Sequence, residues 1–227
     1  MRNSFLRKCQ LVRRGPCELG WLELSNSLLD NCRALAVGVV GEHDRVREPR
    51  VVRHVFVDET KQRGYVVAAA VVVEGDVEPL RRVVRGLVLP GQRRLHMKTE
   101  RDSRRRQIVA ALVEAGAEVV VYDAGTRYRT DLQARGECLR GVVADVAGWA
   151  GATRLVLEQD DSLVRWDSQR LIELARQAGC RDRLQYAHER AAAEALLAVP
   201  DAVAWCWGRG GDWRRRVEPM VSTVHQV

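Results

Sequence analysis

Acidic residues stand at the ends of three predicted strands, and this placement can support metal-ion chemistry. They are Asp58 with Glu59, Asp123, and Glu158. A carboxylate at the carboxyl end of a strand is held rigidly, close to the crevice where open α/β sheets place their sites. Carboxylates that converge in such a crevice repel one another, and Mg²⁺ relieves the repulsion because it takes oxygen ligands. The strand ends therefore predict a divalent-metal site.

Two further acids belong to predicted helices. Asp201 follows Pro200 at the start of an apolar helix, and Glu100 lies near the start of a helix over 99–115. With the strand-end acids they could hold two ions about 4 Å apart, which activate water and stabilise the leaving oxygen of a phosphodiester. A structural role is the alternative for each acid: Asp201 favours its helix N-terminus through the dipole, Glu100 is a first-turn acid, and Asp123 is an ordinary strand-end acid.

The elements that must position these residues follow a regular order from residue 51 onwards. Apolar runs predict strands over 54–58, 65–73, 117–122, 154–157 and 184–187, with 94–98 as a further short candidate. Helical spacing predicts helices over 78–89, 99–115, 130–149, 168–178 and 200–208. Gly64 can adopt positive φ in the turn between the first two strands. The fold class is therefore α/β, a three-layer fold with an antiparallel opening hairpin, a mixed sheet and helices on both faces.

Residues 1–50 differ from the rest of the chain. They show no sustained period of 2 or 3.6, and they end in the polar, charged stretch 41–50. We therefore expect a poorly ordered N-terminal extension over 1–50 and one folded domain over 51–227.

Composition limits the class of protein. The chain has 227 residues, of which 46% are hydrophobic and 30% charged, as in globular proteins that bury a core. No apolar run reaches the roughly 18 residues of a membrane span, and Arg13, Arg14 and Glu18 interrupt the apolar stretch that a secretion signal would need. The expected location is cytoplasmic. Six cysteines without a C-x-x-C pair or zinc spacing are expected to be reduced, structural thiols.

The basic residues are almost all arginine. The net charge is +7, and only Lys8, Lys61 and Lys98 among the 37 basic residues are lysine. A GC-rich genome would produce this bias, and so would phosphate recognition, because guanidinium groups bind phosphate in bidentate fashion. The triplets 104–106 and 214–216 are either solvated helix faces or a rim that attracts a phosphate backbone. The alternatives for Trp205, Trp207 and Trp213 are core packing and base stacking.

Several segments, taken in order, resemble one family. The motif Val55-Phe56-Val57-Asp58-Glu59-Thr60, followed by a hairpin, resembles the opening of the ribonuclease H-like superfamily. It is most similar to an uncharacterised bacterial branch, expected in actinobacteria, that begins with an Asp-Glu-Ser/Thr motif. Residues 95–100, 155–158 and 196–205 resemble later segments of that branch. The resemblance covers about residues 53 to 217.

The resemblance implies four acids that bind two Mg²⁺ or Mn²⁺ ions. Carried over, the catalytic acids are Asp58, Glu100, Asp201 and a third-position acid, which is Glu158 by the branch motif and Asp123 by chain order. The expected metal ligands are accordingly Asp58, Glu158, Asp201 and Asp123. The candidate substrate-binding residues are Glu59, Lys61, His96, Lys98, Arg101 and Asp160.

Three functions are compatible with these patterns. The leading hypothesis is a metal-dependent nuclease, or a related phosphoryl-transfer enzyme, that acts on nucleic acid; His96 and Lys98 would move a proton or hold a phosphate. The second is a non-catalytic module on the same fold that binds nucleic acid or protein. The third is a flavodoxin-like nucleotide binder, against which the absence of a G-x-G-x-x-G or Walker loop counts.

Overall fold

A computed structural model describes residues 53–227, so the extension expected over 1–50 lies outside the described residues. The strands are β1 (Arg53–Thr60), β2 (Tyr65–Val73), β3 (Glu118–Gly125), β4 (Thr153–Glu158), β5 (Leu184–Glu189) and β6 (Val221–Gln226). The helices are α1 (Val77–Gly86), α2 (Asp102–Glu114), α3 (Asp131–Gly148), α4 (Val164–Gln177), α5 (Ala198–Arg209) and α6 (Gly211–Val217). Four single-turn 3₁₀ helices lie at Glu74–Asp76, Met97–Thr99, Ala195–Leu197 and Glu218–Met220.

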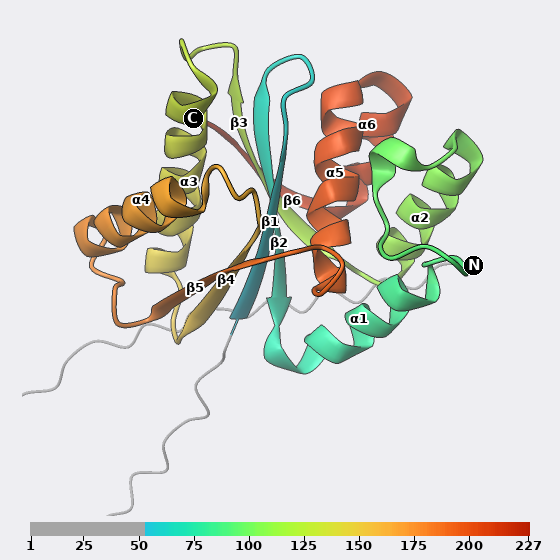
Figure 1. Ribbon diagram of the computed structural model, residues 1–227, viewed down its shortest axis with the longest axis horizontal. Coiled ribbons are helices and arrows are strands. Elements are labelled where there is room, and N and C mark those ends of the chain that lie inside the picture. The colour runs from blue at the N-terminus through green and yellow to red at the C-terminus, as the bar shows by residue number, and fades with distance from the viewer. Residues whose placement is uncertain (1–52) are drawn as a thin grey trace, which may run out of the picture. The chain divides into compact units, whose positions relative to one another are not determined.

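The six strands form one mixed sheet in the order β5-β4-β1-β2-β3-β6 (Figure 1). The pairs β1–β2 and β2–β3 are antiparallel, whereas β1–β4, β4–β5 and β3–β6 are parallel. Only β2 therefore runs against the others, and the carboxyl ends of β1 and β4 meet at the same edge. The opening hairpin turns at Gly64, whose φ of 123° is the positive value that the sequence predicts.

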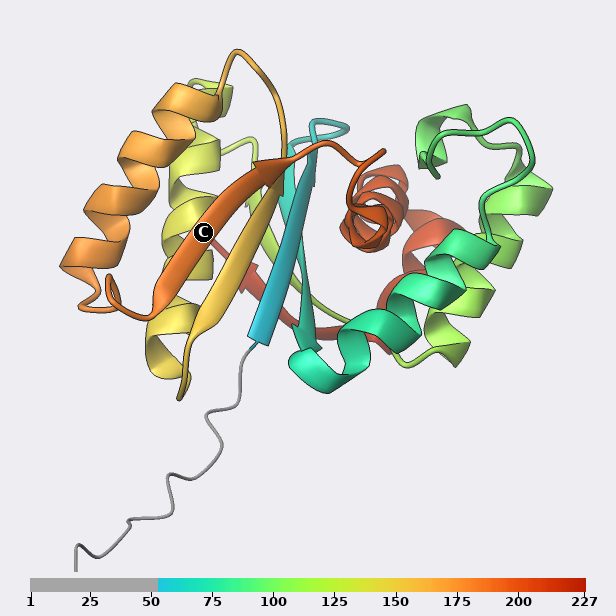
Figure 2. The same cartoon turned by 60° about the horizontal axis from the view of Figure 1, so that its bottom comes forward.

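Helices cover both faces of the sheet (Figures 1 and 2). α1, α2, α5 and α6 pack on one face, and α3 and α4 pack on the other. The alternation along β1 shows the two cores: Phe56 packs with the first group, and Val55 and Val57 pack with the second. This arrangement is the three-layer α/β fold that the sequence predicts, with an antiparallel opening hairpin, a mixed sheet and helices on both faces. No helix within residues 53–227 is both long and apolar enough to span a bilayer.

The structure corrects several sequence predictions of secondary structure. Residues 94–98 do not form a strand, because the Met97 amide donates to the Asp201 carboxylate and the Met97 carbonyl accepts from Arg105. The final predicted helix begins at Ala198, two residues before Pro200, and α4 begins at 164 rather than 168. The sequence patterns did not indicate α6 or β6.

The described cysteines are buried thiols. Cys138, Cys180 and Cys206 are unpaired and lie in the cores. Burial raises the pKa of both the Cys138 and the Cys206 thiols to about 12. Because the thiolate is the nucleophilic form, these cysteines fill the core as small apolar groups.

Candidate active site

Asp58 is the central acid at the carboxyl end of β1. It follows Val57 and faces the α5 side of the sheet, on the same side as Phe56. Its side chain is almost fully buried, with 9% of the residue exposed, and its Oδ1 accepts a hydrogen bond of 2.8 Å from the Glu59 amide. Burial, reinforced by repulsion from Asp201, Glu158 and Glu59, holds the pKa of Asp58 well above its usual value. A desolvated acid therefore stands among other negative charges.

Asp201 reaches the same place from the first turn of α5. Its Oδ2 accepts a hydrogen bond of 2.7 Å from the amide of Met97. Nδ1 of His96 lies 3.4 Å from the same oxygen, at ion-pair distance but without hydrogen-bond geometry. The Asp201 carboxylate raises the pKa of His96. Asp201 thus joins α5 to the segment before α2 and brings an imidazole to the acids.

Glu158 ends β4, one residue beyond the paired Val57 and Leu157, and so lies beside Asp58 across the parallel ladder. It forms an ion pair with Arg94. Its charge contributes to the raised pKa of Asp58, so it acts on that carboxylate in spite of its arginine partner.

Asp58, Asp201 and His96 border a cavity of about 390 Å³ on the α5 side of the sheet. Its lining combines three acids with polar, basic and aromatic side chains: Asp58, Glu59, Thr60, Lys61, Gln62, His96, Lys98, Asp201 and Trp205. A cavity that brings carboxylates and cationic groups together can bind an anion and a cation at once, as a phosphate with its metal ion requires.

The acids fit a divalent ion in part. Within residues 53–227, no group of three or more His, Cys, Asp or Glu side chains is arranged to hold a metal ion. Asp58 and Asp201 nevertheless face one cavity, and the raised pKa of Asp58 reflects its burial and the negative charge around it, both of which a cation would offset. Mg²⁺ is commonly held by one or two carboxylates, with water and substrate phosphates completing its shell. These donors therefore suit a hard cation that keeps several water ligands better than a cation that is enclosed by protein ligands alone.

Three of the candidate acids do not line this cavity: Glu158, which acts on Asp58 from the end of β4, Glu100 and Asp123. Glu100 is buried, with 7% exposed, and its Oε1 accepts a hydrogen bond of 2.9 Å from Gln92. Asp123 lies on β3, which β2 separates from β1, and its Oδ1 accepts from the Gly125 amide at 2.9 Å. The structure therefore brings Asp58, Glu158 and Asp201 into electrostatic contact and leaves Glu100 and Asp123 in separate contacts.

The candidate substrate-binding residues divide in the same way. Lys61, His96 and Lys98 line the cavity. Glu59 borders it, but its carboxylate accepts from Arg135 on α3, on the opposite face of the sheet. Arg101 and Asp160 do not line it: Arg101 is an exposed residue before α2, and Asp160 accepts from Ser162 in an exposed loop.

Trp205 is a cavity residue that the sequence patterns did not single out as part of the site. It lies four residues after Asp201, and this helical spacing places both on one face of α5. The guanidinium of Arg105 lies 4.4 Å from the centre of its ring. The i, i+4 relation to Asp201 was the available signal.

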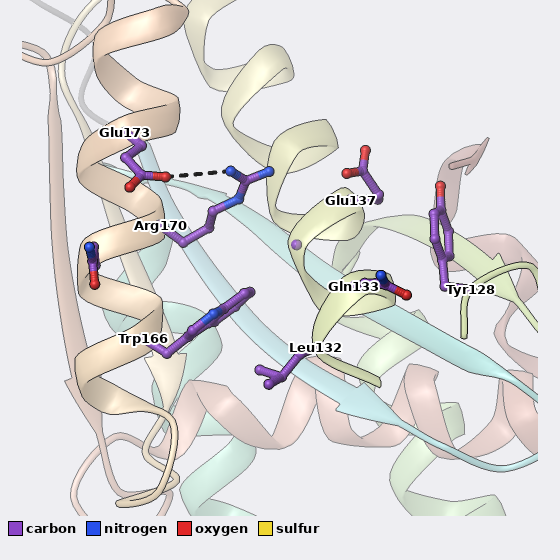
Figure 3. Close-up of a pocket in the computed structure, with 9 residues that line it drawn as sticks. Tyr128, Leu132, Gln133, Glu137, Trp166, Arg170 and Glu173 are labelled. Atoms are coloured by element: carbon purple, nitrogen blue, oxygen red, sulfur yellow. Dashed lines mark hydrogen bonds and ion pairs between the residues drawn. The ribbon is translucent and has the colours of Figure 1, made fainter. Parts of the chain in front are cut away.

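A larger cavity, of about 570 Å³, lies between α3 and α4 on the other face (Figure 3). We call it the α3–α4 groove; its lining residues are Tyr128, Leu132, Gln133, Gly136, Glu137, Trp166, Gln169, Arg170 and Glu173. Its charged side chains have protein partners, since Arg170 lies 3.5 Å from Glu173 and Glu137 pairs with Arg140. The smaller cavity is the better candidate for catalysis, because it alone of the two contains an acid with a raised pKa.

Comparison with known proteins finds structural similarities at low sequence identity. No protein-family model and no curated protein matches the chain. A chain in the structure of the PCNA:RNase HII complex from Archaeoglobus fulgidus is similar over 70% of this chain and 73% of its own, with 13% identity and a TM-score of 0.45. Bst-RNase HIII in complex with Mn²⁺ is similar over 68% of this chain and 51% of its own, with 15% identity and a TM-score of 0.42. This chain spans about half of the Bst-RNase HIII chain, and similarities at this level assign no activity.

Proposed function

We propose that the chain is a metal-dependent nuclease, or a related phosphoryl-transfer enzyme, that acts on nucleic acid. The observation that carries the proposal is the buried carboxylate of Asp58, whose pKa is raised and which shares a cavity with Asp201. An acid that is costly to ionise alone becomes favourable to ionise beside a divalent cation. Strongly perturbed acids in a cavity are frequent at functional sites.

In this proposal Asp58 and Asp201 hold the ion, and Glu158 adds negative charge from the end of β4. When bound, the ion would neutralise phosphate charge and activate a water molecule. Asp123 and Glu100 receive no direct role, because each is hydrogen-bonded outside the cavity.

The cationic side of the cavity is suited to the substrate phosphate. Lys61 and Lys98 are exposed and can contact phosphate oxygens. The raised pKa of His96 increases its protonated fraction near neutral pH, so that it can donate a proton to a leaving oxygen. The two lysines would bind the phosphate, and the imidazole would move a proton.

A surface beside the cavity supports nucleic acid as the substrate. We call it the arginine–tryptophan wall; it comprises Arg105, Arg106, Arg209 and Arg214 with Trp205, Trp207 and Trp213, from α2, α5 and α6. The shortest contact places the Arg214 guanidinium 3.7 Å from the centre of the Trp207 ring. Stacking restricts each guanidinium. The N–H groups of Arg105 donate to Met97, Lys98 and Asp102, whereas those of Arg106, Arg209 and Arg214 can contact phosphate. The wall gives a backbone a positive track toward Asp58.

The test is hydrolysis of labelled RNA, DNA and RNA–DNA hybrid with Mg²⁺ or Mn²⁺. We expect the wild-type chain to cleave at least one substrate and D58A to lose about 10³-fold in rate, or about 4 kcal/mol of barrier. D160N is the matched control, because Asp160 is an exposed loop acid outside the cavity. Equal metal-dependent activity in D58A and D160N would remove Asp58 from the mechanism.

A non-catalytic module is the second candidate, and one observation favours it. Asp201, Glu158 and Glu100 each accept from a protein donor, and no group of three ligands is present in the described residues. Such a module would bind nucleic acid through the arginine–tryptophan wall without a metal. Mn²⁺ would then leave the melting temperature unchanged, whereas a working site would be stabilised by ligand linkage.

A further inference from the structure

A buried arginine joins five elements of the fold beneath the α3–α4 face. Arg135 of α3 is 3% exposed and Asp167 of α4 is 1% exposed. Nε and Nη2 of Arg135 each donate to one oxygen of Asp167 at 2.7 Å, which is a bidentate pair. Nη1 donates to Glu59 of β1 at 2.8 Å and to the Tyr65 hydroxyl of β2 at 3.2 Å. His188 of β5 lies 3.3 Å from Asp167. We call these five side chains the Arg135 network.

The Arg135 network is linked directly to the candidate active site. Glu59 is the residue after Asp58, and strand alternation places the two side chains on opposite faces of the sheet. While Arg135 holds the Glu59 carboxylate on one face, the Glu59 amide donates to Asp58 Oδ1 at 2.8 Å. A shift of the Glu59 backbone would therefore displace the donor that holds Asp58 Oδ1.

Stability is a weak explanation for such a network. Burying the charged groups of Arg135 and Asp167 carries a desolvation penalty, and replacing buried ion pairs by apolar groups of similar volume is often neutral or stabilising. Unlike apolar contacts, ion pairs and their hydrogen bonds fix one geometry of the side chains that they join. In this chain that geometry is imposed where β1 delivers Asp58 to the cavity.

We infer that Arg135 is a positioning residue, which fixes Asp58 by holding Glu59 on the opposite face of the sheet. The inference rests on the proposed function of Asp58. It assigns Glu59 a role through its backbone amide and its tether to Arg135, in place of contact with substrate. Asp167 has the supporting role of fixing the orientation of the guanidinium.

A double-mutant cycle tests the inference. The variants are R135M, E59A and the double variant, assayed with Mn²⁺ on the best wild-type substrate. We expect each single variant to lose about 10²-fold in kcat, as misplacement of a reacting group by about 1 Å can cause, with KM changed less than about threefold. The double variant should be no slower than either single variant, because both remove one interaction. Losses that multiply in the double variant would overturn the inference.

Conservative variants separate position from folding. E59Q keeps an oxygen that can accept from Arg135, so it should recover most of the rate lost in E59A. R135K keeps the positive charge but cannot form the bidentate pair, so its kcat should fall about as far as that of R135M. R135K therefore tests the inference even if R135M folds poorly. R81Q is the matched control, because Arg81 also forms an ion pair, with Glu194. This pair lies on the α1 side of the sheet, opposite the face that holds Arg135. A loss in R81Q as large as in R135K would contradict the inference.

Amide hydrogen exchange gives a readout that needs no activity. We expect the Glu59 amide to exchange about tenfold faster in R135K than in wild type, with no change in R81Q. If the wild-type chain cleaves no substrate, the proposed function fails while this measurement still tests whether Arg135 fixes Glu59. Unchanged exchange at Glu59 in both R135K and R135M would refute the positioning role.

Discussion

The two cavities lie on opposite faces of one sheet, and they differ in charge more than in size. The α3–α4 groove has the larger volume, about 570 Å³ against about 390 Å³, and its arginine and its acids are satisfied by one another or by Arg140. The smaller cavity holds Asp58, an acid that pays for burial with a raised pKa. A large volume does not by itself indicate chemistry, whereas a buried acid without a compensating partner is costly to ionise. The contrast supports our proposal that chemistry takes place in the smaller cavity.

The comparison is tested most strongly by neutralising one acid in each cavity. D201N removes a charge from the smaller cavity but keeps an oxygen for the Met97 amide, and E173Q removes an acid from the α3–α4 groove. We expect D201N to lose about 10²-fold or more in metal-dependent rate, because ion binding requires the anionic oxygen. E173Q should remain within about twofold of wild type. Initial rates of both variants over a range of Mn²⁺ concentrations measure the two effects. Equal losses of rate in D201N and E173Q would contradict the assignment of chemistry to the smaller cavity.

The cost of the buried charge predicts a gain in stability when it is removed. The pKa of Asp58 is higher in the folded chain than its ordinary value of 3.8, so its contribution to stability is fully present below that value and is lost as pH rises through the folded pKa. At pH 8, the free energy of unfolding of D58N should therefore be higher than that of wild type, because the variant carries no buried charge at this position. The difference should shrink toward pH 4.

Urea denaturation at pH 8 and at pH 5 measures this effect. E173Q is again the control, because Glu173 is exposed and contributes no buried charge. A wild-type chain that is more stable than D58N at pH 8 would show that protein donors already compensate Asp58, and the case for a cation would weaken.

Much of the fold could be predicted because its signals are local. The hairpin at Gly64 and the strands and helices on either side are set by turn chemistry and apolar periodicity. The strand expected over 94–98 was wrong, because Asp201, a residue far along the chain, binds the backbone of this segment. β6 was not predicted, since a short strand at a sheet edge depends on pairing with β3 rather than on its own pattern.

In the candidate site, too, residues marked by a local pattern could be predicted, whereas residues that depend on distant partners could not. Asp58 and Asp201 were proposed from their places at a strand end and a helix start, and the structure lines one cavity with both. Arg135 carried no signal, because its partners Glu59 and Asp167 are 76 and 32 residues away and one arginine in a helix reads as a solvated residue. The opposite directions of Asp58 and Glu59 follow from strand alternation, but which of them faces α5 depends on tertiary packing.

Two helical glycines allow the packing around the two cavities to be compared. A Cβ on Gly136, beside the α3–α4 groove, would lie 3.5 Å from Trp166 and 3.7 Å from Arg170, which are ordinary contacts. A Cβ on Gly208 of α5 would lie 3.0 Å from the Thr60 side chain and 3.1 Å from the Gln62 carbonyl, in the hairpin that borders the smaller cavity.

We expect G136A to stabilise the fold by about 0.5–1 kcal/mol, the usual gain of alanine over glycine inside a helix, with unchanged activity. G208A should instead lose about 1–3 kcal/mol through overpacking and lower the rate, because the hairpin must move. Thermal melts and initial rates of the two variants decide the matter, and a stable, fully active G208A would show that the hairpin beside Asp58 is free to adjust.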